Sequence, residues 1–389
     1  DIARYNNIQM AKKISLNSAY GAIGNNWFRY YDLLVAEAIT TSGQLSIRYI
    51  EHSLNRYVNK IVGTVGRDYV LASDTDSVYI TFDGLVSRVF KENQDSGKIV
   101  DFLDRVAREK IEPYIDRSYK TLSEYVNAYE QKMQMKREVI ADKGIWVAKK
   151  RYILNAWDVE GVRYKQPQLK LMGIEAVKSS TPSPCRKKLK DALKIIMSGD
   201  SEELNAFIQD FRQEFMTLPV EEIAYPRSVN GINKFKDNEK SRQRVRKKRE
   251  EMLMKKYKKK NIDAQVEIGT LGDAKVKYGL WSGGAPIHVK GARLYNHLLE
   301  KNKLEHKYPF IQEGDKIKFL HIREPNAYQS TSVSFLTRLP KEFDLHSIID
   351  YDMQFEKSFV EPLKFITDKI QWRLDKSYGT QGTLEGFFT

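Results

Sequence analysis

The chain has 389 residues, which is long enough for two or three domains with a sizeable core. Its net charge of +14 and its pI near 9.4 favour a polyanionic partner. We expect neither a membrane span nor a signal peptide. The single Cys185 excludes an internal disulfide and a Cys-based zinc site, so we expect a protein of the reducing cytoplasm.

The first predicted element is a helix that includes Lys13–Gly21. On a helix, Lys13, Asn17 and Tyr20 are spaced i, i+4 and i+7 and therefore share one face. A cation, an amide and an aromatic ring on one stripe suit a triphosphate, its sugar and a base. The alternative is a solvated face with an ordinary interfacial Tyr.

A second helix is predicted from Asp32 to Lys60, after the helix-stopping pair Gly24-Asn25. Its apolar residues repeat at roughly helical spacing and are expected to form a buried stripe, namely Leu34, Ala38, Leu45, Ile50, Leu54 and Tyr57.

A hairpin is predicted next, because the β-prone runs Tyr69–Ala72 and Val78–Phe82 flank a tight polar tip. The tip carries Asp74 and Asp76 with one small residue between them. Close carboxylates repel each other unless a cation lies between them, and oxygen ligands suit Mg²⁺. Such a pair can hold ions that activate a hydroxyl and stabilise a leaving pyrophosphate. The alternative is a turn that uses Asp for local hydrogen bonds.

The middle of the chain alternates helix and strand patterns, which predicts an α+β fold. A long amphipathic segment from about Lys98 to Gln131 is expected to break at Pro113. Strands follow from Val139 to Met172, with Glu160-Gly161 in a hairpin turn. The run Lys149–Tyr152 is expected on a strand, with alternate side chains on opposite faces. One interpretation of it is an exposed basic edge strand.

The remaining elements are mostly helical. Thr181-Pro182 is expected to cap a helix that ends near Ser198, and Asp200 is expected to cap the next one. The second of these helices carries a core stripe of Leu204, Phe207, Ile208, Phe211 and Phe215. Gly279–Tyr328 is predicted to be strands and turns, and Tyr351–Ile370 a closing helix.

One segment is extreme in charge. Glu239–Lys260 carries twelve Lys or Arg against three Glu, a net charge of +9. We expect a solvated helix or a segment that orders only with its partner, and the sign of the charge favours contact with phosphates.

These motifs together resemble a known family. The Lys13–Gly21 helix and the Ser73–Tyr79 hairpin resemble two signature motifs of family B DNA polymerases. Longer stretches are similar to the replicative polymerases of T-even-type bacteriophages, namely Gly21–Asn25, Phe28–Asp32, Ser73–Tyr79, Lys149–Tyr152, Met172–Glu175 and Lys178–Pro182. The similarity covers most of the chain, with a gap from about residue 235 to 275.

The resemblance implies an α+β polymerase palm with part of the fingers and a mixed, largely helical thumb. The implied domains are the second fingers helix (residues 1–25), the palm (26–175), the thumb (176–375) with a basic insert (235–275), and a clamp-binding tail (376–389). Ile287–Gly291 resembles the returning stretch of the thumb.

The resemblance also implies an activity, which is attack of a primer 3′-hydroxyl on the α-phosphate of a dNTP, with two Mg²⁺ ions. Asp76 would bridge both ions, Asp74 would be a weaker or outer ligand, and Glu138 would lie near the metals. On the predicted helix, Lys13 would neutralise charge on the triphosphate, Asn17 would line the nucleotide pocket, and Tyr20 with Gly21 would contact the nascent base pair. The primer–template DNA would be held by Lys149, Lys150, Arg151 and Tyr152.

By the same resemblance, the amino-terminal domain, the proofreading exonuclease and the first catalytic Asp are absent from this sequence. Catalysis is therefore expected to need an N-terminal polymerase chain, whether the protein is naturally split or truncated. The alternative is a catalytically silent subunit that binds DNA and recruits a clamp. A reverse transcriptase also uses paired carboxylates, but the Lys13–Gly21 helix before the hairpin argues against it. A bacteriophage protein would act in the cytoplasm of its host cell.

The tail spacing Q-x-x-L-x-x-F-F resembles the peptide with which polymerases bind ring-shaped sliding clamps. One helical turn would place Leu384, Phe387 and Phe388 on an apolar plug, with Gln381 at the pocket rim. The alternative is that these residues fold back onto the thumb.

Overall fold

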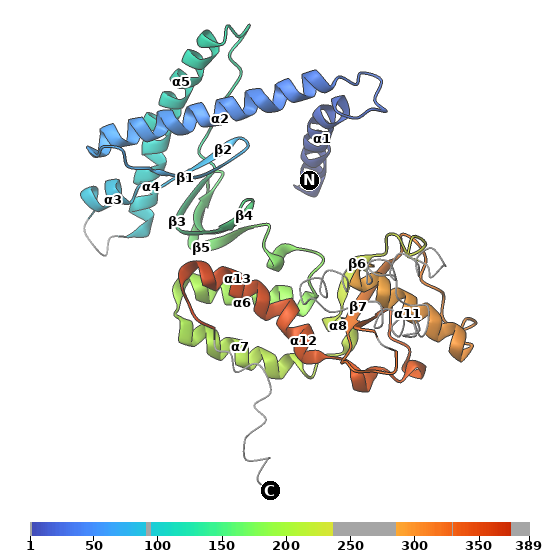
Figure 1. The fold of residues 1–389 in the computed structure, drawn as a ribbon. Helices are drawn as coiled ribbons and strands as arrows, with labels where there is room; N and C mark the ends of the chain where they lie inside the picture. Colours follow the sequence, from blue (N-terminus) through green and yellow to red (C-terminus); the bar gives the residue numbers. More distant parts are fainter. Residues whose placement is uncertain (1, 91–94, 236–284, 329, 375–389) are drawn as a thin grey trace, which may run out of the picture. The chain divides into compact units, whose positions relative to one another are not determined.

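In the computed structural model, the described residues are 2–90, 95–235, 285–328 and 330–374 (Figure 1). The basic segment Glu239–Lys260 and the tail residues Gln381–Thr389 lie outside them. The chain divides into two compact units, residues 1–143 with 154–168 and residues 144–153 with 169–389. Helices and strands mix along the chain, which confirms the α+β prediction, whereas the assignment of fingers, palm and thumb stays a prediction. Among the described residues, no helix has the length and apolarity needed to cross a membrane.

The first unit contains the predicted helices and the carboxylate hairpin. Its elements are α1 (Ile2–Ile23), α2 (Leu33–Val62), β1 (Val70–Asp74), β2 (Ser77–Ile80), α3 (Asp83–Val89), α4 (Ser96–Val106) and α5 (Glu112–Tyr125). A π-helical turn, Ala107–Ile111, joins α4 to α5 without interrupting the helical backbone. The predicted break at Pro113 is therefore wrong, because Pro113 stands in the first turn of α5, where its missing N–H is tolerated.

Helix α2 is the scaffold of this unit. The Asp32 side chain accepts hydrogen bonds from the backbone N–H groups of Leu34 and Val35, and Gly63 ends the helix with a positive φ of 67°. Ile50 and Leu54 are buried against α5 and β1, as predicted. Leu34 and Leu45 are exposed, so the predicted stripe is wrong for the amino-terminal half of α2, where no described element covers them.

The three strands β3 (Val139–Ala148), β4 (Arg151–Val159) and β5 (Val162–Met172) form one sheet in the order β3-β4-β5. The predicted turn at Glu160-Gly161 is confirmed, and both residues have positive φ. Lys149 and Lys150 form the turn between β3 and β4 rather than part of a strand. The predicted alternation of faces is therefore wrong for these two residues, because the chain reverses at Lys150, whose φ is +59°.

A buried ion network ties the first unit together around Asp158. This carboxylate accepts hydrogen bonds from Arg137, from Nε of Arg163 at 3.2 Å and from the backbone N–H of Gly161 at 3.0 Å. Arg137 also bonds Asp104. Burial by itself raises the pKa of Asp158, but the bonds from Arg137, Arg163 and Gly161 outweigh burial and hold that pKa below its ordinary value of 3.8.

We expect Arg137→Met to lower the free energy of unfolding by about 3–5 kcal/mol at pH 7, because it leaves a buried carboxylate short of its main partner. A carboxylate with a depressed folded-state pKa stabilises the protein above its unfolded-state pKa and loses that contribution as the pH falls through the folded value. The difference between the two proteins should therefore shrink below pH 3.8. Urea unfolding at several pH values tests this. Arg117→Met changes an exposed residue of α5 and should have little effect on the free energy of unfolding. An equal loss of unfolding free energy in the two variants would contradict a stabilising role of the network.

The second unit has a helical core joined to a small sheet. Its elements are α6 (Ser183–Ser198), α7 (Ser201–Phe215), α8 (Val220–Ile223), β6 (Tyr225–Ser228), α11 (Ile287–Asn302), β7 (Lys316–His321), β8 (Ser332–Phe335), α12 (Tyr351–Phe355) and α13 (Glu361–Thr367). The antiparallel sheet has the order β6-β7-β8.

The predicted caps of α6 and α7 have different outcomes. Asp200 caps α7 as predicted, by accepting hydrogen bonds from the backbone N–H groups of Glu202 and Glu203. The predicted cap of α6 is wrong, because the N-cap is Pro182 without a side-chain bond and the proline of the first turn is Pro184.

The predicted core stripe of α7 is confirmed. Leu204, Ile208, Phe211 and Phe215 are buried, and Phe207 packs against the same cluster. Tyr351–Ile370 is helical throughout, with a π-helical turn between α12 and α13.

The prediction of strands and turns from Gly279 to Tyr328 is wrong for α11. Gly291 weakened the helical pattern, yet it lies in the interior of this helix. A Cβ at Gly291 would lie 2.5 Å from Oγ of Ser334 and 2.8 Å from its backbone N. The glycine is therefore required by the close approach of α11 to β8, and tertiary packing outweighs its low helix propensity.

Candidate functional site

The β1–β2 hairpin places two carboxylates at its tip. Asp74 ends β1 and pairs with Ser77, while Thr75 and Asp76 form the two-residue turn, with Thr75 at a φ of +56°. The backbone N–H of Asp76 donates to the carbonyl of Asp74 at 2.6 Å, and Oγ1 of Thr75 donates to the Asp74 carboxylate at 3.0 Å. Asp76 is exposed. The predicted hairpin is confirmed, and its tight turn holds both carboxyl groups on the same short segment.

A polar stripe on α2 fixes the position of the hairpin. Glu51, Asn55 and Asn59 are spaced four residues apart and lie on one helix face. Oδ1 of Asn55 accepts from the backbone N–H of Tyr69 at 2.8 Å and of Val70 at 3.1 Å, and Asn59 bonds the carbonyl and N–H of Arg67.

At the distal end of this stripe, the hydroxyl of Ser73 donates to Glu51 at 3.2 Å. Glu51 thus lies beside the strand residue that precedes Asp74.

The core behind the hairpin is apolar and includes α5. Val70 packs with Ile50, Leu54, Ile115 and Tyr119 in one buried cluster. Burial raises the pKa of the Tyr119 hydroxyl, and the negative charge of Asp76 raises it further. The Asp76 carboxylate is therefore close enough to α5 for its charge to act on this buried phenol. The hairpin thus packs against a buried apolar cluster, while Asp76 at its tip is exposed.

The third predicted metal ligand, Glu138, lies just before β3. Its carbonyl accepts from the backbone N–H of Glu160 at 2.6 Å, and its side chain is exposed. Within the described ranges, no group of three or more His, Cys, Asp or Glu side chains is arranged to hold a metal ion. The structure therefore brings Asp74 and Asp76 together on one turn but does not gather Glu138 with them into such a group.

The predicted nucleotide-binding residues lie on α1, which confirms the predicted helix. Lys13, Asn17, Tyr20 and Gly21 are exposed, and no residue of α1 is buried. A Cβ at Gly21 would meet no atom within 4 Å in the part of the chain that the structure describes. Packing within these residues thus gives no reason for a glycine there, and the roles of the four residues stay predictions.

The predicted DNA-binding run is divided between a turn and a strand. Lys149 and Lys150 are exposed, whereas Arg151 is half-buried in an ion pair with Glu175 and lies over the ring of Phe365 at 4.7 Å. Tyr152 is buried, with 7% of its surface exposed. The predicted clamp-binding residues Gln381, Leu384, Phe387 and Phe388 lie outside the described residues.

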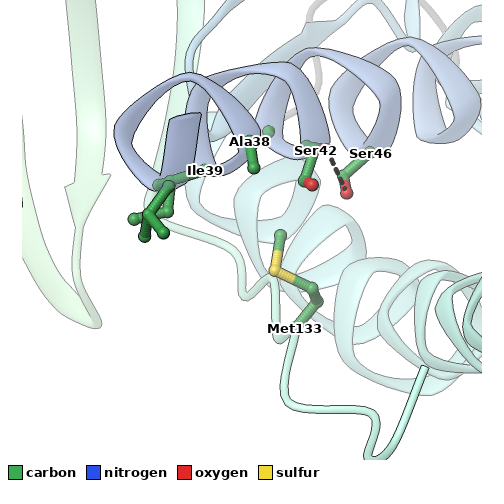
Figure 2. Close-up of a pocket in the computed structure, with 7 residues that line it drawn as sticks. Ala38, Ile39, Ser42, Ser46 and Met133 are labelled. Carbon is green, nitrogen blue, oxygen red and sulfur yellow. Dashed lines mark hydrogen bonds between the residues drawn. The ribbon is translucent and has the colours of Figure 1, made fainter. Parts of the chain in front are cut away.

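The first unit also contains a groove, which is apolar rather than acidic. An apolar groove of about 470 Å³ lies between α2 and Met133 (Figure 2). Among the residues that line it, only Ser42 and Ser46 have polar side chains, and Oγ of Ser46 donates to the carbonyl of Ser42 at 2.8 Å. The groove offers no cation or carboxylate, so we place the candidate site at the hairpin instead.

Sequence reasoning missed the residues that hold the hairpin in place. None of Glu51, Asn55, Asn59 and Tyr119 was singled out from the sequence. Their signal is the four-residue spacing of polar side chains directly beside the buried Ile50, Leu54 and Val58. A polar row beside a core stripe indicates that a loop with unpaired backbone groups packs there.

Two family models match this chain. A model described as "DNA polymerase family B" matches residues 2–101, and one described as "Divergent Family B DNA polymerase" matches residues 58–207. Both matches contain the whole β1–β2 hairpin, and the first also contains α1.

Viral DNA polymerases are similar to the chain over different lengths. The DNA-directed DNA polymerase of Escherichia phage RB69 is 35% identical over 382 residues, which are 95% of this chain and 37% of the relative. That of Enterobacteria phage T4 is 34% identical, over 92% of this chain and 36% of the relative. The DNA polymerase beta of African swine fever virus is 28% identical over 177 residues, or 44% of the chain. The chain thus spans about a third of the length of the two phage relatives.

Proposed function

The chain belongs to the family B DNA polymerases, and from this premise we propose that it supplies the nucleotidyl-transfer centre of a replicative DNA polymerase. The reaction is template-directed addition of a dNTP to the 3′ end of a primer, with release of pyrophosphate. The substrates are primer–template DNA and dNTPs. In this proposal α1 belongs to the fingers, the hairpin to the palm and the second unit largely to the thumb.

The observation that carries the proposal is the pair of carboxylates at the tip of the hairpin, of which Asp76 is exposed and Asp74 is partly buried. Asp74 and Asp76 are held by β1–β2 pairing, and the hairpin is fixed by Asn55 of α2. These oxygen donors fit Mg²⁺, which keeps several waters and binds through one or two carboxylates plus substrate phosphates. When bound, the ions would activate the primer hydroxyl and neutralise charge on the leaving pyrophosphate.

The protein residues have distinct tasks in this proposal. Asp76 is exposed at the turn and would be the main ligand of the metal ions, whereas Asp74 has one oxygen engaged by Thr75 and would be the weaker ligand. Lys13 neutralises the triphosphate, where charge develops in the transition state. Asn17 and Tyr20 share its helix face and contact the sugar and the nascent base pair. Glu138 is a candidate ligand that needs substrate or further protein to join the pair.

In this proposal, the rest of the centre lies in the part of the phage relatives that the chain does not cover. We propose that the preceding portion contributes a further catalytic carboxylate and the exonuclease, whether on the same chain or on a separate one. The tail, through Leu384, Phe387 and Phe388, binds a sliding clamp, and Glu239–Lys260 adds phosphate contacts.

Primer extension tests this function directly. The chain is assayed alone and together with the portion that precedes it in the relatives, joined or added as a second polypeptide. Extension at about 1–10³ s⁻¹ is expected only when both are present. Comparable extension by the chain alone would refute the need for the other portion. Duplex binding without extension under both conditions would contradict the polymerase proposal and favour a silent DNA-binding subunit.

A further inference from the structure

The second unit contains a polar cavity of about 530 Å³. Four cationic side chains line it, from Arg151, Lys178, Arg227 and Lys357, but only two carboxylates, from Glu175 and Glu361. Burial lowers the pKa of His321 in the same wall, so that imidazole is neutral at pH 7. The cavity thus carries an excess of two positive charges, which an anion would balance.

The carboxylates are unevenly shared among the cations. Glu175 pairs with both Arg151 and Lys178, and Glu361 pairs with Lys357. Arg227 has no carboxylate within 4.0 Å among the described residues. Its Nη1 donates to the carbonyls of Ser180 and Pro226, each at 3.2 Å, which holds the guanidinium in place.

Hydrogen-bond donors in the wall remain available. Nε and Nη2 of Arg227 have no partner within the described ranges, and Nε of Arg151 is buried without one. Unpaired guanidinium donors in a partly buried site favour an oxyanion with several acceptor oxygens, and phosphate matches their geometry.

The aromatic rings in the cavity are already engaged. Tyr225 stacks on Phe319 with ring centroids 5.1 Å apart, and Arg227 lies 5.8 Å from the centre of the Tyr225 ring. Arg151 lies over Phe365. The cavity therefore offers charge and hydrogen bonds rather than an open face for a nucleobase.

We propose that this cavity binds the phosphate group of a nucleotide, with Arg227 as its anchor and with Arg151 and Lys178 as further donors. Glu175 competes for Arg151 and Lys178 and so weakens the site. The phosphate comes either from a free nucleotide or from a DNA backbone. The inference rests on the cavity and not on the polymerase activity, so phosphate binding and primer extension can fail independently.

Calorimetric titration of the full chain with inorganic phosphate, dAMP and deoxyadenosine tests a free-nucleotide source. Phosphate and dAMP should bind, and deoxyadenosine should not. Arg227→Gln should weaken dAMP binding at least about tenfold. Arg338→Gln removes the same charge from an exposed position outside the cavity and should change nothing. Glu175→Gln should tighten binding several-fold, a gain that misfolding cannot produce.

Duplex DNA titrated at several salt concentrations tests a backbone source. If the cavity holds a backbone phosphate, the slope of log affinity against log salt becomes shallower by about one unit in Arg227→Gln and not in Arg338→Gln. A response in either experiment supports the site and identifies its source. Equal behaviour of Arg227→Gln and Arg338→Gln in both experiments, or weaker binding by Glu175→Gln, would overturn the proposal.

Discussion

Asp76→Asn is expected to reduce single-nucleotide incorporation by the complete polymerase at least about a thousandfold. The change keeps the size of the side chain but removes the charge that two cations would share in the proposed centre, so both the attacking and the leaving oxygen would lose stabilisation. A thousandfold loss corresponds to about 4 kcal/mol in the activation free energy. Rapid-quench measurement of the first added nucleotide separates this loss from effects on DNA release.

The exposure of Asp76 makes this variant informative, because the fold does not depend on its carboxylate. Duplex affinity and the melting temperature should remain near those of the parent protein. Asp116→Asn removes the same charge from an exposed position on α5 and should retain normal incorporation. Near-normal turnover by Asp76→Asn would mean that the hairpin is an ordinary turn.

Lys13→Ala should lower kcat/KM for the incoming dNTP by about a hundredfold, the scale of losing one charged donor to a reacting phosphate. The side chain is exposed on α1 and has no ion pair among the described residues, so its loss should not unfold the helix. Steady-state incorporation at varied dNTP concentrations measures the effect.

Lys12→Ala is the matched control for this helix. Lys12 is also exposed, but it projects about 100° away around α1 and misses the face shared with Asn17 and Tyr20. It should lower kcat/KM by less than about threefold, the scale of a distant screened charge. Equal losses in the two variants would indicate a general effect of charge and contradict the assigned face.

Local patterns predicted much of the fold because local forces decide those elements. Asp32 and Asp200 cap their helices through their own side chains, and Gly161 marks its turn because glycine adopts a positive φ readily. Helix α11 was missed because Gly291 weakens the helical pattern, and only contact with Ser334 of β8 explains it. Lys150 was misplaced because its positive φ has no signal in a Lys side chain.

The candidate site was predictable only in part for the same reason. The carboxylates and the α1 stripe are visible as short motifs, since their members are close in sequence. The support from Glu51, Asn55 and Tyr119 depends on contacts across many residues, such as Asn55 with Tyr69 and Val70. Their chemistry is ordinary in isolation and becomes informative only when the hairpin lies against α2 and α5.

Metal-directed cleavage tests the central claim that the hairpin is the metal centre. Fe²⁺ replaces Mg²⁺ in the presence of primer–template, a non-hydrolysable dNTP, hydrogen peroxide and ascorbate. The hydroxyl radicals that form when Fe²⁺ reduces the peroxide cut the nearby backbone, and ascorbate regenerates Fe²⁺. Cleavage is expected at residues 73–77, suppressed by excess Mg²⁺ and lost in Asp76→Asn. Cleavage elsewhere in the chain, with residues 73–77 intact, would contradict the account.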